Sequence, residues 1–209
     1  LPMQQAASDA LGDNKGAVFV MEASTGKILV MLSKPSYDPN DVEDSWYVLN
    51  SDEENSPFLN RVTQGLYAPG STFKIVTTLE YMRENADYAN YSFDCAGTFE
   101  HQNFVMTCWT KSAQGLLDLR GSFAQSCNCS YANIALTLDR AAYRDTAEEL
   151  LFNQKLPSLL DYSKSSFVVT DATGDSELMM TAMGQGNTLA SPYHMGLICA
   201  AIANGGTLM

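Results

Sequence analysis

The sequence predicts an α+β fold in which a cluster of helices accompanies an antiparallel sheet. Residues 16–33 carry one β-hairpin signal, and the helical patterns gather after residue 70 instead of alternating with strands. At 209 residues the chain is long enough for one sizeable core. Its hydrophobic share of 45% is ordinary for a globular protein, so we do not expect disorder.

The first part of the chain is expected to contain a helix end, a hairpin and an acidic loop. Residues 1–11 have the character of a helix that stops at Gly12, and Ser24 to Lys27 form the hairpin turn between two apolar runs. Residues 38–54 are rich in Asp and Glu and hold no Lys or Arg. That composition is typical of a solvated, mobile loop.

A central, mostly buried helix is expected to begin at Ser71. Its apolar residues recur at helical spacing, at Phe73, Val76, Leu79 and Met82. Few strongly polar residues interrupt the segment, which favours a helix that is covered on most sides.

The later helices follow from their capping residues and breakers. Residues 118–139 are helical in tendency but broken near Gly121 and Ser122, and residues 143–155 form an amphipathic helix. Residues 165–175 are expected to be loop or short strand. The last helix has Ser191 as N-cap and Pro192 at its first position, and the Asn-Gly pair at 204–205 ends it.

Charge and cysteine content exclude several classes of protein. A net charge of −12 argues against nucleic acid and anionic membrane surfaces as partners, and no run of about 20 apolar residues could span a bilayer. The five cysteines match neither paired zinc-binding spacing nor an even-numbered disulfide framework. Cys95 and Cys108 flank one loop and could form a disulfide in an oxidising compartment, a question that the sequence leaves open. Cys199 is expected to be a buried apolar residue.

Ser71 and Lys74 form the first chemical motif, within the stretch "APGSTFK". Side chains three positions apart share a helix face, so the lysine amine can reach the serine hydroxyl. The positive end of the helix dipole disfavours a protonated lysine in the first turn, by about 0.3–1 kcal/mol, and burial lowers the lysine pKa further. Both effects favour a neutral amine that can accept the serine proton.

The same Ser-x-x-Lys spacing also occurs at Ser24 and Lys27, where it carries no chemistry. Those two residues lie in the hairpin turn and have no helix face to share, so Ser24 is expected to be a turn residue. Ser126 and Asn128 form the only Ser-x-Asn triplet in the chain. They add a second hydroxyl for proton transfer and an amide for binding a peptide-like substrate.

These motifs resemble those of a known family, the transpeptidase domain of penicillin-binding proteins of the monofunctional, class B-like type. The similarity runs over residues 1–209, which we expect to form one partial transpeptidase domain. Its most specific segments are the hairpin "GAVFVMEASTGKILVMLSKPSYDPN", the nucleophile segment "LNRVTQGLYAPGSTFKIVT", the loop "CAGTFEHQNFVMTCW", the triplet "SCN" and the later segment "GQGNTLASPYHMGLICAAIANGG".

Two departures from the family pattern affect what is expected of the fold. Gly121, Ser122 and Phe123 stand where relatives often carry an Ala-Leu helix. The third motif, Lys-Thr/Ser-Gly, is absent, and in the family it lies on a C-terminal strand beyond the position of Met209. We therefore expect a truncated penicillin-binding protein or serine β-lactamase-like fold that lacks its C-terminal strands. A hairpin strand would then have an unpaired edge, and the fragment would acylate slowly and self-associate.

The resemblance implies the reaction and the roles of four residues. Lys74 takes the proton of Ser71, which attacks the penultimate D-Ala carbonyl of a peptidoglycan stem peptide. Ser126 passes a proton to the leaving D-Ala, and Asn128 holds the substrate amide. The Ser71 N–H supplies half of the oxyanion hole, a neighbouring stem peptide accepts the acyl group, and β-lactams trap Ser71.

The resemblance implies neither a cofactor nor a metal. The expected partners are stem peptides, β-lactam antibiotics and cell-wall synthesis proteins, and no nucleic acid. The expected location is the extracytoplasmic face of the bacterial plasma membrane, with the parent protein anchored by an N-terminal helix that this chain does not contain.

Three other functions stay open at this point. A serine β-lactamase or a D,D-carboxypeptidase would need a group that activates water for deacylation, and no carboxylate is an obvious candidate. A β-lactam sensor or scaffold domain would keep Ser71 and Lys74 without turnover. A Ser-His-Asp hydrolase is disfavoured because neither His101 nor His194 accompanies a G-x-S-x-G motif, and both are expected to be structural.

Overall fold

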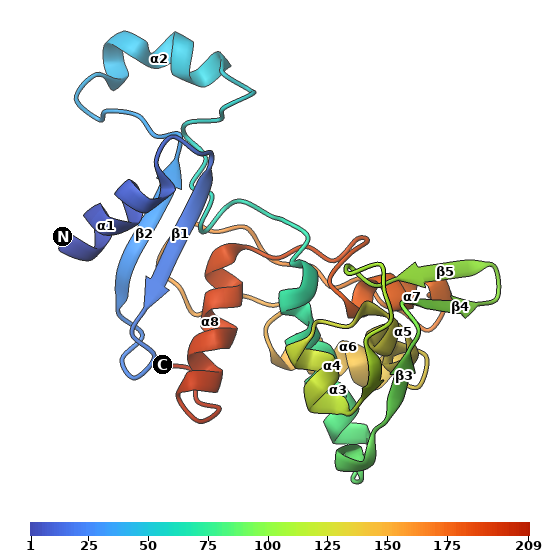
Figure 1. The fold of residues 1–209 in the computed structure, drawn as a ribbon. Coiled ribbons are helices and arrows are strands. Elements are labelled where there is room, and N and C mark those ends of the chain that lie inside the picture. The colour runs from blue at the N-terminus through green and yellow to red at the C-terminus, as the bar shows by residue number, and fades with distance from the viewer. The chain divides into compact units, whose positions relative to one another are not determined.

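A computed structural model describes residues 1–209, and the chain folds into two compact units (Figure 1). The first unit comprises Leu1–Tyr67, Lys155–Ser165 and Ala190–Met209, and the second comprises Ala68–Gln154 and Ser166–Leu189. Helices occur together with antiparallel strand pairs, so the predicted α+β class is confirmed. No helix has both the length and the apolar character needed to cross a membrane.

The first unit contains the predicted hairpin. Strands β1 (Gly16–Met21) and β2 (Ile28–Lys34) pair antiparallel in a two-stranded sheet, with Ser24 in the turn. Helix α1 (Pro2–Leu11) packs mainly on β2 and ends at Gly12, whose φ is 57°. The sheet has only two strands, so each strand has one unpaired edge, whereas the resemblance implied an unpaired edge on one of them.

Helix α8 (Pro192–Ala203) packs on β1 and has the predicted caps. The Ser191 hydroxyl accepts a hydrogen bond from the backbone N–H of His194, and the helix ends at the predicted Asn-Gly pair. A Cβ at Gly196 would lie 2.5 Å from ring atoms of Phe19. Glycine at this position therefore lets the helix approach the strand closely.

Cys199 is exposed, so the expectation that it is buried is wrong. Helix α8 is apolar on every side, and such a pattern does not indicate which side faces the sheet. The neighbouring positions Leu197, Ile198 and Ala200 are the buried ones. Cys199 lies between them in sequence but falls on the exposed side.

The acidic segment contains a helix, α2 (Val42–Ser51), so the loop prediction is wrong over these residues. Glu43 and Asp44 lie in its first turn, where the helix dipole favours negative charge. The Trp46 ring lies 5.2 Å from the ring of Phe58, which fixes one side of the helix. The acidic composition of residues 38–54 correctly indicated exposure to solvent. It did not indicate the helix, which the acidic residues of its first turn stabilise.

Helix α3 (Lys74–Glu84) is the central helix of the second unit, and a 3-10 turn, η1 (Gly70–Phe73), precedes it. The other helices of this unit are η2 (Tyr88–Asn90), α4 (Leu119–Ala124), α5 (Asn128–Ala135), α6 (Arg140–Glu149) and α7 (Asp175–Ala182). Helix α3 contacts both α5 and α6, and α5 contacts α7. The helix predicted over residues 143–155 is α6, which begins three residues earlier and ends at Glu149.

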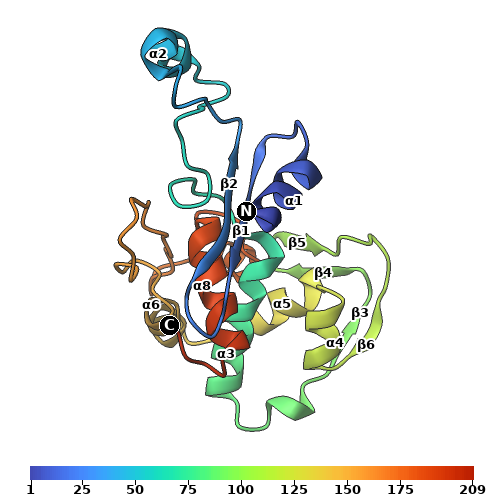
Figure 2. The same ribbon diagram turned by 90° about the vertical axis from the view of Figure 1, so that its left-hand side faces the viewer.

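Four short strands form two small sheets beside α4 and α5 (Figure 2). Strand β3 (Phe93–Cys95) pairs with β6 (Gly115–Leu117), and β4 (Thr98–His101) pairs with β5 (Phe104–Thr107). Residues 165–175 form no strand of their own before α7, and a single bridge joins Ser166 to Leu189.

The buried side of α3 differs from its predicted apolar stripe. Phe73 and Val76 are buried as expected, but Met82 is 36% exposed. The polar residue Thr77 is buried instead, because its hydroxyl is hydrogen-bonded to the Tyr143 hydroxyl and donates to the backbone carbonyl of Ala182. Hydrogen bonding to neighbouring elements thus lets polar positions of α3 enter the core.

The helix break before α5 lies later than the sequence predicted. Helix α4 continues through Gly121 and Ser122, since Asp118 caps it by accepting from the backbone N–H of Gly121 at 2.6 Å. The break falls at residues 125–127, where Ser126 has a φ of 53°. A Gly-Ser pair weakens a helix but does not end it when its caps are satisfied.

Candidate active site

Ser71 and Lys74 are brought together by the junction of η1 and α3. Ser71 lies in the 3-10 turn, and Lys74 is the first residue of α3. Side chains three positions apart eclipse each other in a 3-10 turn, so this geometry aligns the hydroxyl with the amine more directly than an α-helix would. Ser71 is exposed, whereas Lys74 is only 1% exposed.

The Lys74 amine is the centre of the site. Its Nζ lies 2.8 Å from the Ser126 carbonyl oxygen and 2.8 Å from Asn128 Oδ1. It also lies 3.0 Å from Ser126 Oγ and 3.4 Å from Ser71 Oγ. A neutral amine has two N–H donors, which the two carbonyl-type oxygens occupy. Its lone pair is then left for a serine hydroxyl, which is the arrangement that a general base requires.

An unusual backbone conformation at Ser126 contributes two of these contacts. Its φ of 53° lies in the left-handed region that non-glycine residues seldom adopt. With this conformation, both the carbonyl and the hydroxyl of the same residue reach Lys74 Nζ. Such backbone conformations cost about 1–3 kcal/mol and cluster at functional sites. Asn128 follows as the first residue of α5, with Cys127 as the N-cap.

Burial lowers the pKa of the Lys74 amine to about 8. Nearby thiolates would oppose this shift, but burial raises the pKa of Cys127 to about 12 and that of Cys129 even further. Both thiols are therefore neutral near pH 7, and burial is the largest influence on the pKa of Lys74. An appreciable fraction of Lys74 is consequently neutral at physiological pH.

Tyr131 borders the lysine and was not identified from the sequence. The centroid of its buried ring lies 5.2 Å from Lys74 Nζ, and its hydroxyl is hydrogen-bonded to Thr78 Oγ1. A ring at this distance favours the protonated amine by about 0.5–2 kcal/mol. In the sequence, the position of Tyr131 could be inferred only from its spacing: it comes three residues after Asn128, on the same side of a helix.

Gly184 supports the turn that presents Ser71, and it too was missed. Its carbonyl accepts a hydrogen bond from the Gly70 N–H at 2.9 Å, and its φ is 72°. A Cβ at this position would lie 2.1 Å from the Gly70 carbonyl oxygen and 2.7 Å from the Phe73 Cβ. Any side chain here would displace the backbone of Gly70, next to Ser71, and the side chain of Phe73.

We expect Gly184→Ala to lower the free energy of unfolding by about 3 kcal/mol, near the upper end for single substitutions. The added methyl group meets backbone atoms, and the positive φ adds strain. Thermal and urea unfolding measure the change. Gly174→Ala is the matched control, since a Cβ there meets nothing within 4 Å. Similar stabilities for the two variants would contradict the assigned role of Gly184.

Four buried thiols form a cluster within and next to the Ser126–Asn128 segment, namely Cys95, Cys108, Cys127 and Cys129. The Sγ atoms of Cys95 and Cys108 are 3.5 Å apart and are not bonded to each other. Cys127 joins this pair, and the three sulfur atoms lie within 4.8 Å of one another. Such a group can hold a thiophilic metal ion. Sequence spacing did not predict it because the third thiol comes from another segment.

The two histidines lie in different units. His194 is buried in α8, and His101 lies at the end of β4 with its Nε2 2.8 Å from Asp175 Oδ2. His101 is thus paired with a carboxylate of α7 and lies outside the Ser71–Lys74 contacts. The Ser24 and Lys27 pair remains in the hairpin turn of the first unit.

A serine hydroxyl, a buried lysine amine and a second serine hydroxyl thus lie together, in the combination of residues on which serine–lysine acyl-transfer enzymes rely. The family model described as "Penicillin binding protein transpeptidase domain" matches residues 16–209. The chain belongs to this family.

Among known proteins, the chain is similar to peptidoglycan D,D-transpeptidase PbpA of Mycobacterium tuberculosis. The two are 31% identical over 227 residues, covering 99% of this chain and 45% of that protein. The ceftriaxone acyl-enzyme complex of penicillin-binding protein A from M. tuberculosis matches with a TM-score of 0.87 and 31% identity, over 98% of this chain and 49% of that chain.

A structure of PBP2 in complex with MreC from Helicobacter pylori matches with a TM-score of 0.87 and 26% identity, over 98% of this chain and 41% of that one. The chain thus spans about half the length, or less, of these relatives.

Proposed function

We propose that this chain provides the acyl-enzyme centre of a peptidoglycan D,D-transpeptidase. The observation that supports this most strongly is the position of Lys74 Nζ, within 3.4 Å of Ser71 Oγ, 3.0 Å of Ser126 Oγ and 2.8 Å of Asn128 Oδ1. Family membership and the β-lactam acyl-enzymes of relatives point in the same direction.

In the first half-reaction, the neutral Lys74 amine takes the proton of the Ser71 hydroxyl. Ser71 Oγ attacks the carbonyl carbon of the penultimate D-Ala of a stem peptide, and the backbone N–H of Ser71 stabilises the oxyanion. The tetrahedral intermediate then breaks its C–N bond. The proton passes from Lys74 through the Ser126 hydroxyl to the leaving D-Ala amine, and the product is an ester on Ser71.

In the second half-reaction, an amine of a neighbouring stem peptide attacks the ester. Lys74 and Ser126 carry the amine proton back to Ser71 Oγ as the ester bond breaks. The products are a new amide cross-link and the free serine. Asn128 holds the donor peptide by its amide group in both steps, and a β-lactam replaces the donor and leaves a long-lived ester.

The proposed partners follow from this chemistry. They are peptidoglycan stem peptides, β-lactam antibiotics and other proteins of cell-wall synthesis, for which the complex of H. pylori PBP2 with MreC is a precedent in the family. The proposed location is the extracytoplasmic face of the plasma membrane, where the substrate lies. The strongly acidic chain, with a net charge of −12, is unsuited to binding nucleic acid.

The test uses the protein at its natural full length, a soluble pentapeptide ending in D-Ala-D-Ala, and an added acceptor amine. We expect release of D-Ala together with formation of the cross-linked amide. Hydrolysis of the pentapeptide without cross-link formation, at a rate that the acceptor does not change, would indicate a carboxypeptidase. Rapid penicillin hydrolysis would indicate a β-lactamase, and a stable penicillin adduct without peptide turnover would indicate a sensor.

The pH dependence of acylation is expected to follow the Lys74 amine. Because only the neutral amine accepts a proton, the acylation rate should rise with pH and level off above its pKa of about 8. At about pH 6 the neutral fraction is about one hundredth, so the rate should be about a hundredfold below its plateau. Stopped-flow measurement with a fluorescent penicillin gives the profile. A flat profile between about pH 6 and 9 would contradict a titrating lysine base.

A further inference from the structure

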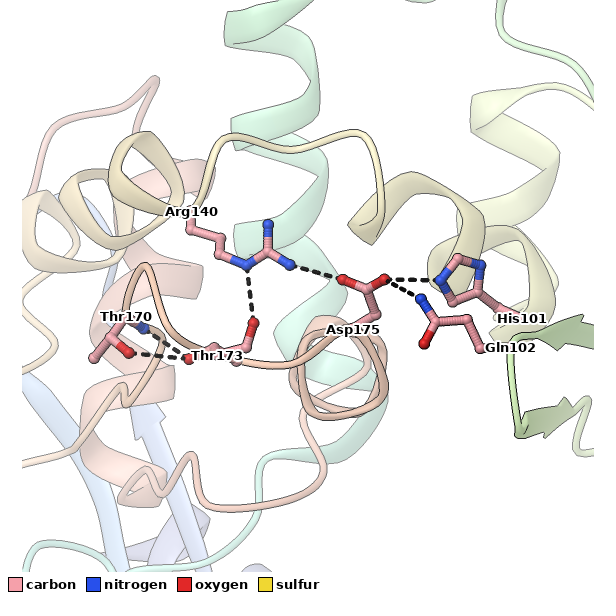
Figure 3. A network of polar contacts seen from close by, with 6 residues as sticks. All are labelled: His101, Gln102, Arg140, Thr170, Thr173 and Asp175. Atoms are coloured by element: carbon pink, nitrogen blue, oxygen red, sulfur yellow. Dashed lines mark hydrogen bonds and ion pairs between the residues drawn. The ribbon is translucent and has the colours of Figure 1, made fainter.

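The turn of the β4–β5 hairpin is held by a carboxylate from another part of the second unit (Figure 3). The side chains of His101 and Gln102 both reach Asp175 Oδ2, at 2.8 and 3.2 Å. On the other side, the Arg140 guanidinium bonds Asp175 Oδ1 at 2.8 Å, and its Nε donates to the Thr173 carbonyl at 3.0 Å. One carboxylate thus joins the hairpin tip to the N-terminal ends of α6 and α7.

The charge state of Asp175 suits this role. Hydrogen bonding from His101, together with the nearby Arg140, lowers the pKa of the Asp175 carboxyl below its ordinary value. It is the first residue of α7, where the helix dipole also favours a negative charge. The carboxylate therefore remains ionised and offers both oxygens to its donors.

The other end of the same hairpin contacts the catalytic segment. The carbonyl of Thr107, the last residue of β5, accepts a hydrogen bond from Asn128 Nδ2 at 3.4 Å. The opposite side of that amide, Oδ1, lies 2.8 Å from Lys74 Nζ. The Asn128 amide is therefore held between Thr107 and Lys74, with its carbonyl oxygen toward the lysine.

The hairpin needs an anchor at its tip because it lacks a third strand. Strands β4 and β5 have four residues each and form a sheet of their own. The hairpin packs on α5 and Met106 is buried, but a two-stranded hairpin is only marginally stable by itself. Motion at its turn would reach Thr107, which is only about 10 Å away. Fixing the turn between two helix ends restricts that motion.

We propose that Asp175 and His101 are positioning residues for the transpeptidase reaction, acting through the β4–β5 hairpin and Thr107 on the orientation of Asn128. The proposal rests on the proposed acyl-enzyme function. A displaced Asn128 would present its amide wrongly to the substrate and would release one of the two acceptors that orient the Lys74 amine. Small misplacements of this kind cost up to about a hundredfold in rate.

The test compares acylation by a fluorescent penicillin in the protein at its natural full length. We expect Asp175→Asn to lower the acylation rate about tenfold to a hundredfold with little change in melting temperature. Asp171→Asn is the matched control, since Asp171 lies in the same segment and pairs only with Arg144, at 3.5 Å. His101→Ala, which leaves the Arg140 contact intact, should reproduce the loss if Asp175→Asn fails to fold.

A double-substitution cycle separates positioning from general stabilisation. If the contacts of Asp175 with His101 and Gln102 act through Asn128, Asp175→Asn should have almost no further effect on the residual acylation rate of Asn128→Ala. The ¹⁵N NMR signals of the Asn128 side-chain amide should shift in Asp175→Asn but not in Asp171→Asn. The proposal would be overturned if Asp175→Asn lowered the acylation rate equally in the unsubstituted protein and in Asn128→Ala. Unchanged Asn128 amide signals in Asp175→Asn would overturn it as well. Failure of the proposed function would instead appear as absent acylation of the unsubstituted protein.

Discussion

Replacing Ser71 by alanine should abolish the covalent penicillin adduct, because no other hydroxyl combines exposure with contact to Lys74. Ser71 Oγ is exposed in η1 and lies 3.4 Å from the lysine amine. Ser126 Oγ is closer, at 3.0 Å, but it belongs to the strained residue that also gives its carbonyl to the same amine. Ser126 is therefore better placed to relay a proton than to attack.

Mass spectrometry of the penicillin-treated, full-length protein measures this outcome. The label should lie on the peptide that contains Ser71, and it should disappear in Ser71→Ala. Ser24→Ala is the matched control, since Ser24 belongs to the second Ser-x-x-Lys sequence but lies in a hairpin turn. A label on the Ser24 peptide, or one that persists in Ser71→Ala, would show that the nucleophile is assigned wrongly.

Replacing Lys74 by arginine should lower acylation by about 10²–10⁴-fold, the usual contribution of a general base. Arginine keeps its proton at every accessible pH, so it has no lone pair to offer the Ser71 hydroxyl. The amine that it replaces is buried and has a pKa of about 8, which makes its neutral form available. The acylation rate measures the effect, and circular dichroism establishes that the fold is kept.

Two further variants make the lysine test decisive. Lys27→Arg, in the hairpin turn, should acylate at the rate of the unsubstituted protein. Lys74→Met removes the amine while filling most of its volume, so it reports on the base if the larger arginine disturbs packing around this buried position. Acylation of Lys74→Met within about tenfold of the original rate would mean that another group takes the serine proton.

The two contacts of Asn128 connect the role expected of Lys74 with the proposed role of Asp175 and His101. Its Oδ1 occupies one N–H of Lys74, and its Nδ2 is held by Thr107 of β5. The orientation of the base therefore depends on a residue outside the Ser71–Lys74 turn. Acylation is expected to respond to changes at Asp175 even though Asp175 contacts neither serine nor lysine.

The sequence by itself determined the local features of this protein. The β1–β2 hairpin and the caps of α8 were predicted because each depends on residues close together in the chain. The pairing of Ser71 with Lys74 was also predicted, since a separation of three residues fixes it in any helical turn. Ser126 and Asn128 were recognised as a motif, and the resemblance to a family supplied their expected roles.

Only the tertiary structure decided how these pieces meet and what surrounds them. Gly184, Tyr131 and Thr107 reach the site from segments distant from Ser71, and no local pattern encodes such contacts. The same limit explains why the burial of single residues was not predicted correctly or was not predicted at all. The exposed side of Cys199 depends on which face of an apolar helix meets the sheet, and the burial of Thr77 depends on partners from other elements. Spacing along the chain fixes neighbours within a turn, whereas long-range packing sets the direction of the hydrogen bonds that Lys74 makes with Ser126 and Asn128.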